Sequence, residues 1–293
     1  MLGVIIALIA SLAWAGSSIL VKYLSSKIDA ISMNTLRLWV GSIVLIALVF
    51  ITGRSGLLVQ TPFIPILMVI ASGILSNAIG DTVYIQSLSY LDVSISYPIS
   101  QSAFPLMTLI VAILFLNESF TWFNIVGAIC VIAGIVMIVV NNKKPGIAKK
   151  VTRKGVLLSL IAAVLWTAGS VTLKIGLAKV DTFLAAAIRV TASALILTTL
   201  AFGRKSQDRM KLNTYGTRNL LFVAAAGILT YTIGAIGYVT AIHLIGAGKS
   251  VLLSASAPIF LLPFSVLILK EHPTRLALVG VFISIVGICL VAL

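Results

Sequence analysis

Long apolar stretches separated by short polar gaps dominate the pattern of this chain. A helix needs about 20 predominantly apolar residues to cross the hydrocarbon core of a bilayer. A membrane β-barrel is excluded, because its strands are only about 10 residues long and alternate with period two. The pattern therefore predicts an all-α membrane protein with ten transmembrane helices. These helices are expected at residues 2–22, 31–51, 63–87, 93–115, 122–140, 155–174, 183–202, 218–241, 247–268 and 274–293.

The two halves of the chain repeat each other. Chance matching of apolar residues would not align Trp, Lys, Asp, Arg, Tyr and Glu together. At an offset of 152, Gly3, Trp14, Ser18, Lys22, Asp29 and Arg37 fall on Gly155, Trp166, Ser170, Lys174, Asp181 and Arg189. At 154, Gly73, Gly80 and Tyr84 fall on Gly227, Gly234 and Tyr238. At 153, Pro105, Glu118, Thr121, Gly127 and Gly134 fall on Pro258, Glu271, Thr274, Gly280 and Gly287.

Each predicted repeat holds five helices. Because five is an odd number and the link between the halves is short, the second repeat must enter the membrane with the opposite orientation. We therefore predict a first repeat at 1–140, a basic linker at 141–154 and a second, inverted repeat at 155–293. Inverted repeats recur in secondary transporters, whose substrate site lies near the bilayer midplane between the halves.

Several short motifs occur in the same order in both halves. The first helix carries Trp14-Ala-Gly-Ser-Ser before Lys22, or Trp166-Thr-Ala-Gly-Ser before Lys174. The second helix carries Leu36-Arg37 or Ile188-Arg189 near its start, and the fourth has an inner proline and ends in Leu116-Asn117-Glu118 or Leu269-Lys270-Glu271. The fifth carries Gly127 and Gly134, or Gly280 and Gly287. In order, spacing and duplication, these motifs resemble the EamA family of the drug/metabolite transporter superfamily over essentially the whole chain.

The resemblance implies a transporter, since the family consists of transporters and many of them export amino acids and other small metabolites. It also implies that the glycine-bearing fifth helices have a dimer or scaffold role. The small multidrug relatives have a similar helix plan but use an acidic residue in the first helix. Residues 2–22 contain no Asp or Glu, which argues against proton-coupled exchange of cationic drugs by that route.

Composition supports the membrane assignment. Hydrophobic residues make up 60% of the chain and charged residues only 10%, with a mean hydropathy of +1.18, whereas soluble domains carry about 25% charged residues. The net charge of +14 raises the question of nucleic-acid binding. Because the Lys and Arg residues gather at the ends of apolar segments, we expect them to contact lipid headgroups instead. The expected location is the cell (inner or cytoplasmic) membrane, with multiple passes.

The orientation in that membrane stays open. If both termini were cytoplasmic, most of the 21 Lys and Arg residues would lie outside, so the positive-inside rule favours both termini outside. The resemblance to the EamA family implies cytoplasmic termini. A topology reporter fused to Leu293 distinguishes the two arrangements.

Asp81 is the acidic residue that lies well inside an apolar segment. An ionisable group at membrane depth usually faces the bundle interior and has a function. It shares one helix face with Gly73, Asn77, Gly80 and Tyr84, and the eighth helix repeats this face without the acid, as Gly227, Tyr231, Gly234, Ala235 and Tyr238. We hypothesise that both faces line a cavity, with Asp81 as a proton acceptor or the binder of a substrate amine. The alternatives are pairing with a nearby Arg and exposure to headgroups.

The fourth and ninth helices each carry an inner proline, which frees the carbonyl group four residues earlier. Pro105 frees the carbonyl of Gln101, on a face with Tyr97, and Pro258 frees that of Ser254. Freed carbonyls persist in a membrane only when they are buried in protein or face a wet cavity. They are expected either to bind polar groups of a substrate or to mark a bend that merely shapes packing.

Two further stripes are candidates for the substrate path. Trp14 and Ser18, like Trp166 and Ser170, lie one turn apart on the first helix of each half, where an indole ring would form an apolar wall. Packing or interfacial anchoring is the competing interpretation for both tryptophans. Arg37 and Arg189 could bind a carboxylate, pair with Asp81, or contact headgroups near the start of their segments.

These patterns lead to one functional prediction. The chain is expected to be a secondary transporter, not an enzyme, that exports small amphipathic metabolites such as amino acids by alternating access, as a monomer or homodimer. It contains no metal-ligand spacing and no phosphate-cradling loop, so no metal or cofactor is expected and gradient energy would drive transport. The alternatives are a sugar-phosphate or nucleotide-sugar antiporter and a non-transporting membrane scaffold or lipid scramblase.

Overall fold

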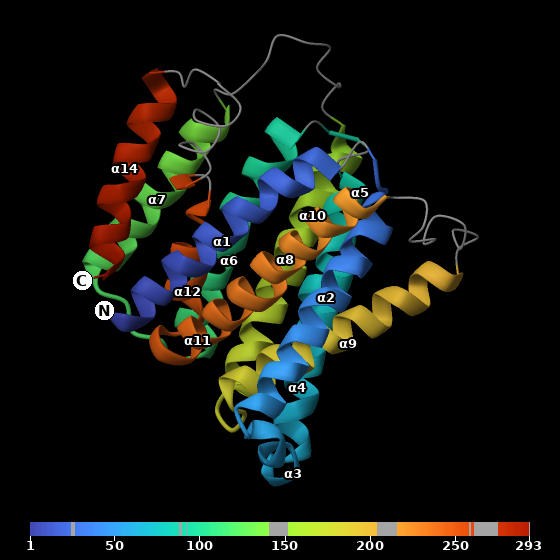
Figure 1. Ribbon diagram of the computed structural model, residues 1–293. Coiled ribbons are helices and arrows are strands. Elements are labelled where there is room, and N and C mark those ends of the chain that lie inside the picture. The colour runs from blue at the N-terminus through green and yellow to red at the C-terminus, as the bar shows by residue number, and fades with distance from the viewer. Residues whose placement is uncertain are drawn as a thin grey trace.

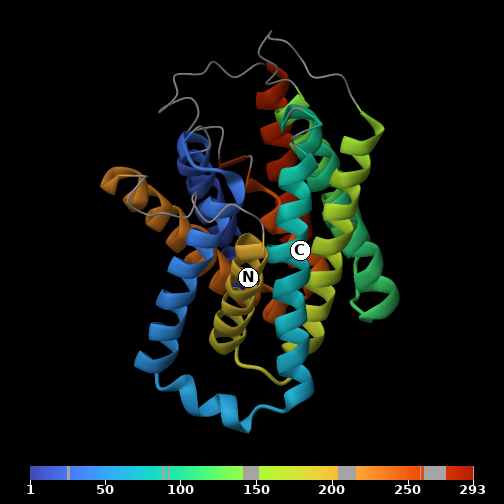
Figure 2. The same ribbon diagram turned by 90° about the vertical axis from the view of Figure 1, so that its right-hand side faces the viewer.

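The computed structural model describes residues 1–24, 27–87, 90–91, 93–140, 152–203, 216–257, 259–260 and 275–292. Within these ranges the chain is helical and contains no strand, which confirms the predicted all-α class. The helices form one bundle, and the amino and carboxyl ends lie near each other in both views (Figures 1 and 2). Most of the predicted basic linker, 141–154, and the residues Pro258 and Glu271 lie outside the described residues.

The first half contains five helical segments at the predicted places. Its third segment is a compound helix, in which a π-helical stretch joins two α-helices. The elements are α1 (Leu2–Leu24), α2 (Ala30–Ile51), the short η1 (Arg54–Gly56) and α3 (Leu57–Gln60), the compound helix α4 (Phe63–Gly73), η2 (Ile74–Gly80) and α5 (Asp81–Ser87), then α6 (Val93–Phe115) and α7 (Trp122–Val140).

The second half repeats this plan, including the compound helix. Its elements are α8 (Arg153–Gly176), α9 (Thr182–Gly203), the compound helix α10 (Thr217–Gly227), η5 (Ile228–Gly234) and α11 (Ala235–Ile245), then α12 (Ala247–Ser254) and α14 (Arg275–Ala292). Helix α8 begins two residues before the predicted start, because the hydroxyl of Thr152 caps it by accepting from the backbone N–H of Gly155 at 3.2 Å.

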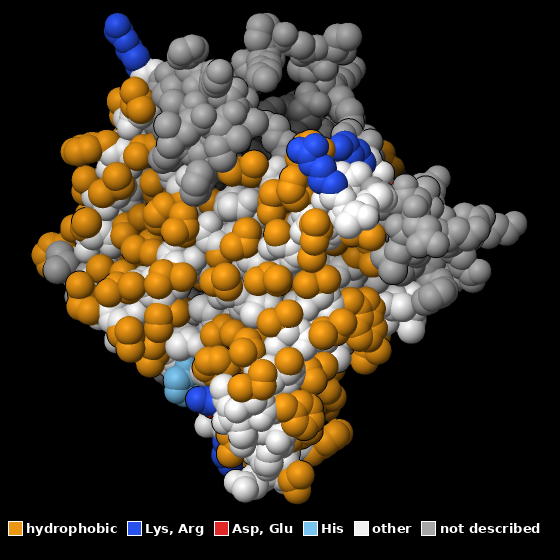
Figure 3. Space-filling model, viewed as in Figure 1, with side chains coloured by type: hydrophobic (Ala, Val, Ile, Leu, Met, Phe, Trp, Pro, Cys, Tyr) orange, Lys and Arg blue, Asp and Glu red, His pale blue; other side chains and the backbone are white. Residues whose placement is uncertain are grey.

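Six helical spans of the described chain are long and apolar enough to cross a bilayer. On the face shown in Figure 3, hydrophobic side chains cover a broad middle area, and Lys and Arg side chains appear toward the upper and lower margins. Such a surface suits lipid. The six spans are Leu2–Val21, Ile31–Ile51, Phe63–Tyr84, Arg153–Gly176, Thr182–Leu200 and Thr217–Ile245, and the shorter apolar helices are Ile99–Phe115, Trp122–Met137 and Leu278–Ala292.

Two of the acidic residues at segment ends are helix caps in equivalent positions. Asp29 accepts from the backbone N–H of Ser32 at 3.1 Å at the start of α2. Asp181 accepts from the N–H groups of Phe183 and Leu184 at the start of α9. A carboxylate at this position satisfies amides that have no partner within the helix. The repeated Asp is therefore explained by helix capping and not by transport.

Helices α7 and α14, the last of each half, lie side by side (Figure 1). Their backbones meet at the glycines that the sequence repeats. A Cβ atom on Gly127 would come within 2.7 Å of the carbonyl oxygen of Gly287, and one on Gly134 would overlap Ser284 and Gly280. Small residues permit this approach in membrane helices. The glycine face expected to serve a dimer or scaffold is thus used between two helices of one chain.

Glu118 joins the end of the fourth segment of the first half to the start of α12. Its carboxylate accepts from the backbone N–H groups of Ala247 at 2.6 Å and Gly248 at 3.1 Å. The preceding Gly246 has a φ of 86° and leaves no room for a side chain, because a Cβ atom there would come within 2.5 Å of the Glu118 carboxylate. This carboxylate accepts from amides that have no partner within the helix, and its charge complements the positive end of the α12 dipole.

Replacing Glu118 with alanine should lower the free energy of unfolding by about 1–2 kcal/mol, the usual effect of losing a helix cap. The measurement is the thermal unfolding midpoint of the purified protein in detergent. Glu118→Gln is the matched control, because its amide oxygen still accepts one of the two N–H groups and should retain part of the stability. An unchanged midpoint for Glu118→Ala would show that the cap contributes nothing.

Candidate functional site

Two π-helical stretches occupy equivalent positions in the middle of the compound helices. Both η2 (Ile74–Gly80) and η5 (Ile228–Gly234) contain seven residues. A π-helix is rare and frequently coincides with a functional site, because its wider turn redirects side chains. Asn77, one of the predicted pathway residues, lies buried in η2 with its Oδ1 atom 3.3 Å from the hydroxyl of Ser76.

Arg37 and Arg189 each reach from the second helix of one half to the π-helix of the other half. Arg37 Nη2 donates to the hydroxyl of Thr230 in η5 at 2.7 Å. Arg189 donates from Nε to Ser72 at 3.0 Å and from Nη2 to Ser76 at 2.5 Å. Arg189 is only 6% exposed. Arg189 therefore lies buried inside the bundle and Arg37 is half-buried, and the hydrogen bonds of both arginines link the two halves.

The tryptophans of the two first helices pack in equivalent ways. The rings of Trp14 and Tyr238 lie 5.5 Å apart, and so do the rings of Trp166 and Tyr84. Each pair joins α1 or α8 to the compound helix of the opposite half. A Cβ atom on Gly80 would come within 2.8 Å of Trp166, so a larger residue at position 80 would clash with the indole ring. Four of the predicted pathway residues thus form two aromatic pairs related by the repeat.

Asp81 begins α5 directly after the π-helix, and its half-buried carboxylate has neutral partners. Trp166 donates from Nε1 to Oδ1 at 2.9 Å, and the hydroxyl of Tyr231 lies 3.4 Å from Oδ2. The same hydroxyl lies 2.6 Å from Oδ1 of Asn34 on α2. One hydroxyl proton serves one acceptor at a time, so Asp81 and Asn34 share a single donor.

No ion pair within 4.0 Å joins Asp81, Arg37 or Arg189 to another described residue; the described chain has such a pair between Arg54 and Asp181. Pairing of Asp81 with an arginine, the structural alternative from the sequence, is therefore not observed in this part of the chain. Burying a carboxylate and two guanidinium groups in a membrane protein without a direct counter-ion costs folding free energy. Such groups are therefore expected to have a role in function.

The two equivalent serines of the first helices have different surroundings. Ser170 is buried, and its hydroxyl lies 2.7 Å from that of Tyr238. Ser18 is exposed and donates to the carbonyl of Trp14 on its own helix at 2.8 Å. We use the name central cluster for Asp81, Tyr231, the two arginines, the two aromatic pairs and the polar side chains that contact their side chains. The structure places Ser170 in this cluster and leaves Ser18 outside it.

The fourth helices of the two halves also differ. Helix α6 continues through Pro105, which is buried, and Gln101 is half-buried on it. Helix α12 ends at Ser254, a buried residue whose hydroxyl has no described partner. Pro258 and the side chain of Tyr97 lie outside the described residues. None of the predicted residues on these two helices has a described contact with Asp81.

The sequence does not single out several polar residues of the central cluster. They are buried or half-buried serine, threonine and asparagine side chains inside apolar segments, and their contacts with Arg37, Arg189 and Tyr231 cross between the helices. Helical spacing could have found some of them, because Asn34 lies one turn before Arg37 on the same face of α2. The residues are Ser17, Asn34, Ser72, Ser76 and Thr230.

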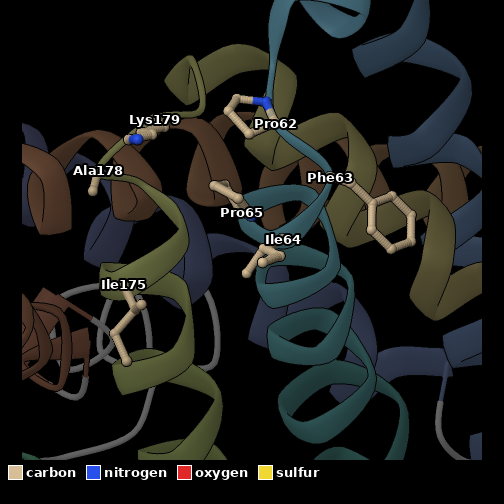
Figure 4. A pocket seen from close by; sticks show the side chains of 7 residues that line it. All are labelled: Pro62, Phe63, Ile64, Pro65, Ile175, Ala178 and Lys179. Carbon is tan, nitrogen blue, oxygen red and sulfur yellow. The ribbon is translucent and has the colours of Figure 1, made fainter.

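A surface hollow of about 550 Å³ lies away from this cluster, between the start of α4 and the end of α8 (Figure 4). Its lining is mostly apolar, with Lys179 at one side; the other lining residues are Pro62, Phe63, Ile64, Pro65, Ile175 and Ala178. Because the hollow contains neither Asp81 nor an arginine, we do not assign the substrate to it.

Comparison with known proteins now identifies the family. The model of the EamA-like transporter family matches residues 1–140 and, a second time, residues 153–293. The chain belongs to the EamA-like transporter family. Membership makes it a transporter with several membrane-spanning helices and a small-molecule substrate, as the resemblance implied, and a transporter is not an enzyme.

The chain is also similar to individual transporters and to a solved structure. An uncharacterised transporter of Archaeoglobus fulgidus is 24% identical over 293 residues, which are 100% of this chain and 99% of that protein. A Rickettsia felis protein named as an S-adenosylmethionine uptake transporter is 31% identical over 123 residues, 42% of this chain and 40% of its own length. A solved crystal structure has the same fold, with a TM-score of 0.80, 18% identity and coverage of 98% of this chain and 95% of that one.

Proposed function

We propose that this member of the family is a secondary transporter of the cell (cytoplasmic) membrane that exports small amphipathic metabolites such as amino acids. The observation that carries the proposal is Asp81, a carboxylate in the middle of a membrane bundle, held by an indole and a phenol and not by a cation. A purely structural carboxylate at this depth would be expected to have a positive partner. A carboxylate with neutral partners is available to a substrate amine or to a proton.

The proposed architecture has ten transmembrane helices in two inverted repeats, residues 1–140 and 155–293, joined by the linker 141–154. Three observations support it. The family model matches twice, and π-helices occupy equivalent places in the two halves. Each arginine or tryptophan contact from the first half to the second also has an equivalent contact from the second half to the first. Alternating access would follow from rocking of one bundle against the other around these contacts.

The proposed pathway runs between the two compound helices and the first helices. Its centre is Asp81 with Tyr231, and its walls are the two aromatic pairs. Arg37 and Arg189 flank the centre, because their guanidinium groups lie against the rings of Tyr231 and Tyr238. The aromatic pairs are Trp14 with Tyr238 and Trp166 with Tyr84. The other predicted residues of the path are Ser18, Asn77, Tyr97, Gln101, Ser170 and Ser254, with helix breaks at Pro105 and Pro258.

The substrate class has support from relatives of known name. Two Rickettsia proteins, from Rickettsia felis and Rickettsia bellii, are named as S-adenosylmethionine uptake transporters and are 31% and 32% identical over 123 residues. S-adenosylmethionine and the amino acids share one chemical feature, an α-amino carboxylate. Because these relatives are named for uptake, both directions of transport have to be measured, although export remains our proposal.

Transport by purified protein in proteoliposomes tests the proposal. The experiment measures counterflow and net efflux of each of the twenty amino acids and of S-adenosylmethionine, with and without an imposed proton gradient. We expect saturable transport of at least one α-amino acid and no transport by liposomes that lack the protein. Transport of sugar phosphates alone, or lipid scrambling alone, would contradict the proposal.

A further inference from the structure

Asn34 and Arg37 lie one turn apart on α2 and present donors that have no described acceptor. Asn34 is only 4% exposed, and its Nδ2 atom is buried without a partner among the described residues. Nε of Arg37 is likewise buried and unpartnered in the described part of the chain. A buried donor without an acceptor costs about 1–3 kcal/mol. Two such donors on one helix face, beside the proposed path, indicate a place for an acceptor group.

Tyr231 connects these donors to Asp81. The guanidinium carbon of Arg37 lies 5.3 Å from the centroid of the Tyr231 ring, on which a cation is stabilised. The hydroxyl of the same tyrosine lies between Asn34 Oδ1 at 2.6 Å and Asp81 Oδ2 at 3.4 Å. Tyr231, which is only 5% exposed, therefore has a guanidinium group with one unpartnered donor, Nε, against its ring and a carboxylate near its hydroxyl.

From this arrangement we infer that Asn34 and Arg37 form a carboxylate subsite, and that Asp81 binds the amine of the same ligand. The site then accepts the zwitterionic head group of an α-amino acid. A carboxylate provides the acceptor that Asn34 Nδ2 and Arg37 Nε lack among the described residues, and an ammonium group provides Asp81 with the direct ion-pair partner that no described residue supplies. This inference rests on the proposed function and specifies which part of the substrate is recognised.

The second half does not contain an equivalent site. At the repeat offsets, Asn34 falls on Ala186 and Asp81 falls on Ala235. The equivalent arginine, Arg189, uses both Nε and Nη2 on serine hydroxyls at 3.0 and 2.5 Å. The two halves of the bundle therefore share a similar fold but contain one proposed head-group site. That site depends on Asn34 and Asp81, two positions at which the repeats differ.

The rings beside Asp81 indicate the rest of the ligand. Trp166, which donates to Asp81, has Tyr84 at 5.5 Å and Phe104 at 5.8 Å between ring centroids. An aromatic surface of this kind favours an apolar, thioether or cationic side chain over an anionic one. L-methionine is therefore a suitable probe, and it shares its head group with S-adenosylmethionine.

The test compares L-methionine with L-methionine methyl ester, which keeps the amine and lacks the carboxylate. Binding of both is measured by isothermal titration calorimetry on the full-length protein, and transport of labelled methionine is measured in proteoliposomes. Wild-type protein should bind methionine at least about tenfold more tightly than the ester, because hydrogen bonds to a charged group contribute about 1.5–3 kcal/mol. Asn34→Ala should reduce this preference severalfold by weakening methionine binding and leaving ester binding nearly unchanged.

Two more variants sharpen the result. Asn34→Asp has the same shape but only acceptor atoms, so it should weaken methionine binding more than Asn34→Ala does. Thr35→Ala is the matched control, because Thr35 is a buried neighbour whose hydroxyl donates to Ile31 O of its own helix, at 2.8 Å, and has no other partner among the described residues. It should keep the wild-type preference. The tolerated Ala186 at the equivalent position suggests that Asn34→Ala folds.

The possible outcomes distinguish failure of the proposed carboxylate subsite from failure of the proposed function. If wild-type protein transports methionine but Asn34→Ala and Asn34→Asp keep the full preference over the ester, the carboxylate subsite is wrong and the transporter assignment stands. If wild-type protein binds neither compound and transports no amino acid, the proposed substrate class itself is wrong, and the inference with it. Loss of the preference in Thr35→Ala as well would show a general packing effect and would also overturn the inference.

Discussion

Replacing Asp81 with asparagine should reduce transport by about 10- to 100-fold, because a charge-assisted contact with the substrate amine contributes about 1.5–3 kcal/mol. The protein should still fold. Asparagine has the same shape, its oxygen accepts from Trp166 Nε1, and its amide can donate to the hydroxyl of Tyr231. The measurement is the initial rate of methionine counterflow in proteoliposomes, normalised to the amount of reconstituted protein.

Asp29→Asn is the matched control for this change. Asp29 is an aspartate of the first half that lies just before α2, where its carboxylate caps the helix through the N–H of Ser32, and asparagine caps a helix about as well. This variant should transport at the wild-type rate. Undiminished counterflow by Asp81→Asn would remove Asp81 from the pathway. Loss of folded protein in Asp81→Asn, judged by a broadened gel-filtration profile, would assign the carboxylate to the scaffold.

Replacing Gly134 with valine should strongly destabilise the fold. A side chain there overlaps Ser284 and the carbonyl of Gly280 on α14, and the backbones of two packed helices must separate to admit it. Overpacking of a well-packed interface typically costs about 1–3 kcal/mol. We expect a clear fall of the thermal unfolding midpoint in detergent and a lower yield of monodisperse protein.

Ile129→Val is the control for Gly134→Val, because Ile129 lies on the same helix but is 63% exposed. Its midpoint should stay within experimental error of the wild type. A chemical cross-linking experiment on the native membrane adds a second readout. If Gly134→Val changed only the fraction of cross-linked dimer and left the midpoint unchanged, the glycine face would serve a second copy and not the contact between α7 and α14.

The positions of the helices could be predicted from the sequence, because they depend on one strong signal. An apolar run of about 20 residues must become a helix in lipid, and a helix or compound helix lies in every predicted range that the structure describes. Asp81 also follows from sequence, since a lone acid in such a run is conspicuous. The π-helices do not follow, because a widened turn leaves the apolar pattern unchanged.

The polar partners of the site escaped prediction for a different reason. Matching the two halves draws attention to residues that recur, such as Trp14 with Trp166 and Arg37 with Arg189. Asn34 has an alanine as its counterpart, so this comparison passes over it, and a single buried asparagine in an apolar segment resembles any polar residue tolerated by packing. Its importance appears only when the tertiary structure places it beside Tyr231.

The contact between α7 and α14 has a consequence for how the chain is made. Helix α7 lies in the first half and α14 in the second, so the glycine surface of α7 is synthesised well before its partner. Until α14 is inserted, the glycine face of α7 lacks the helix that packs on it. A chain truncated before α14 would leave this face without its partner, and we expect such a chain to be less stable and more prone to aggregation.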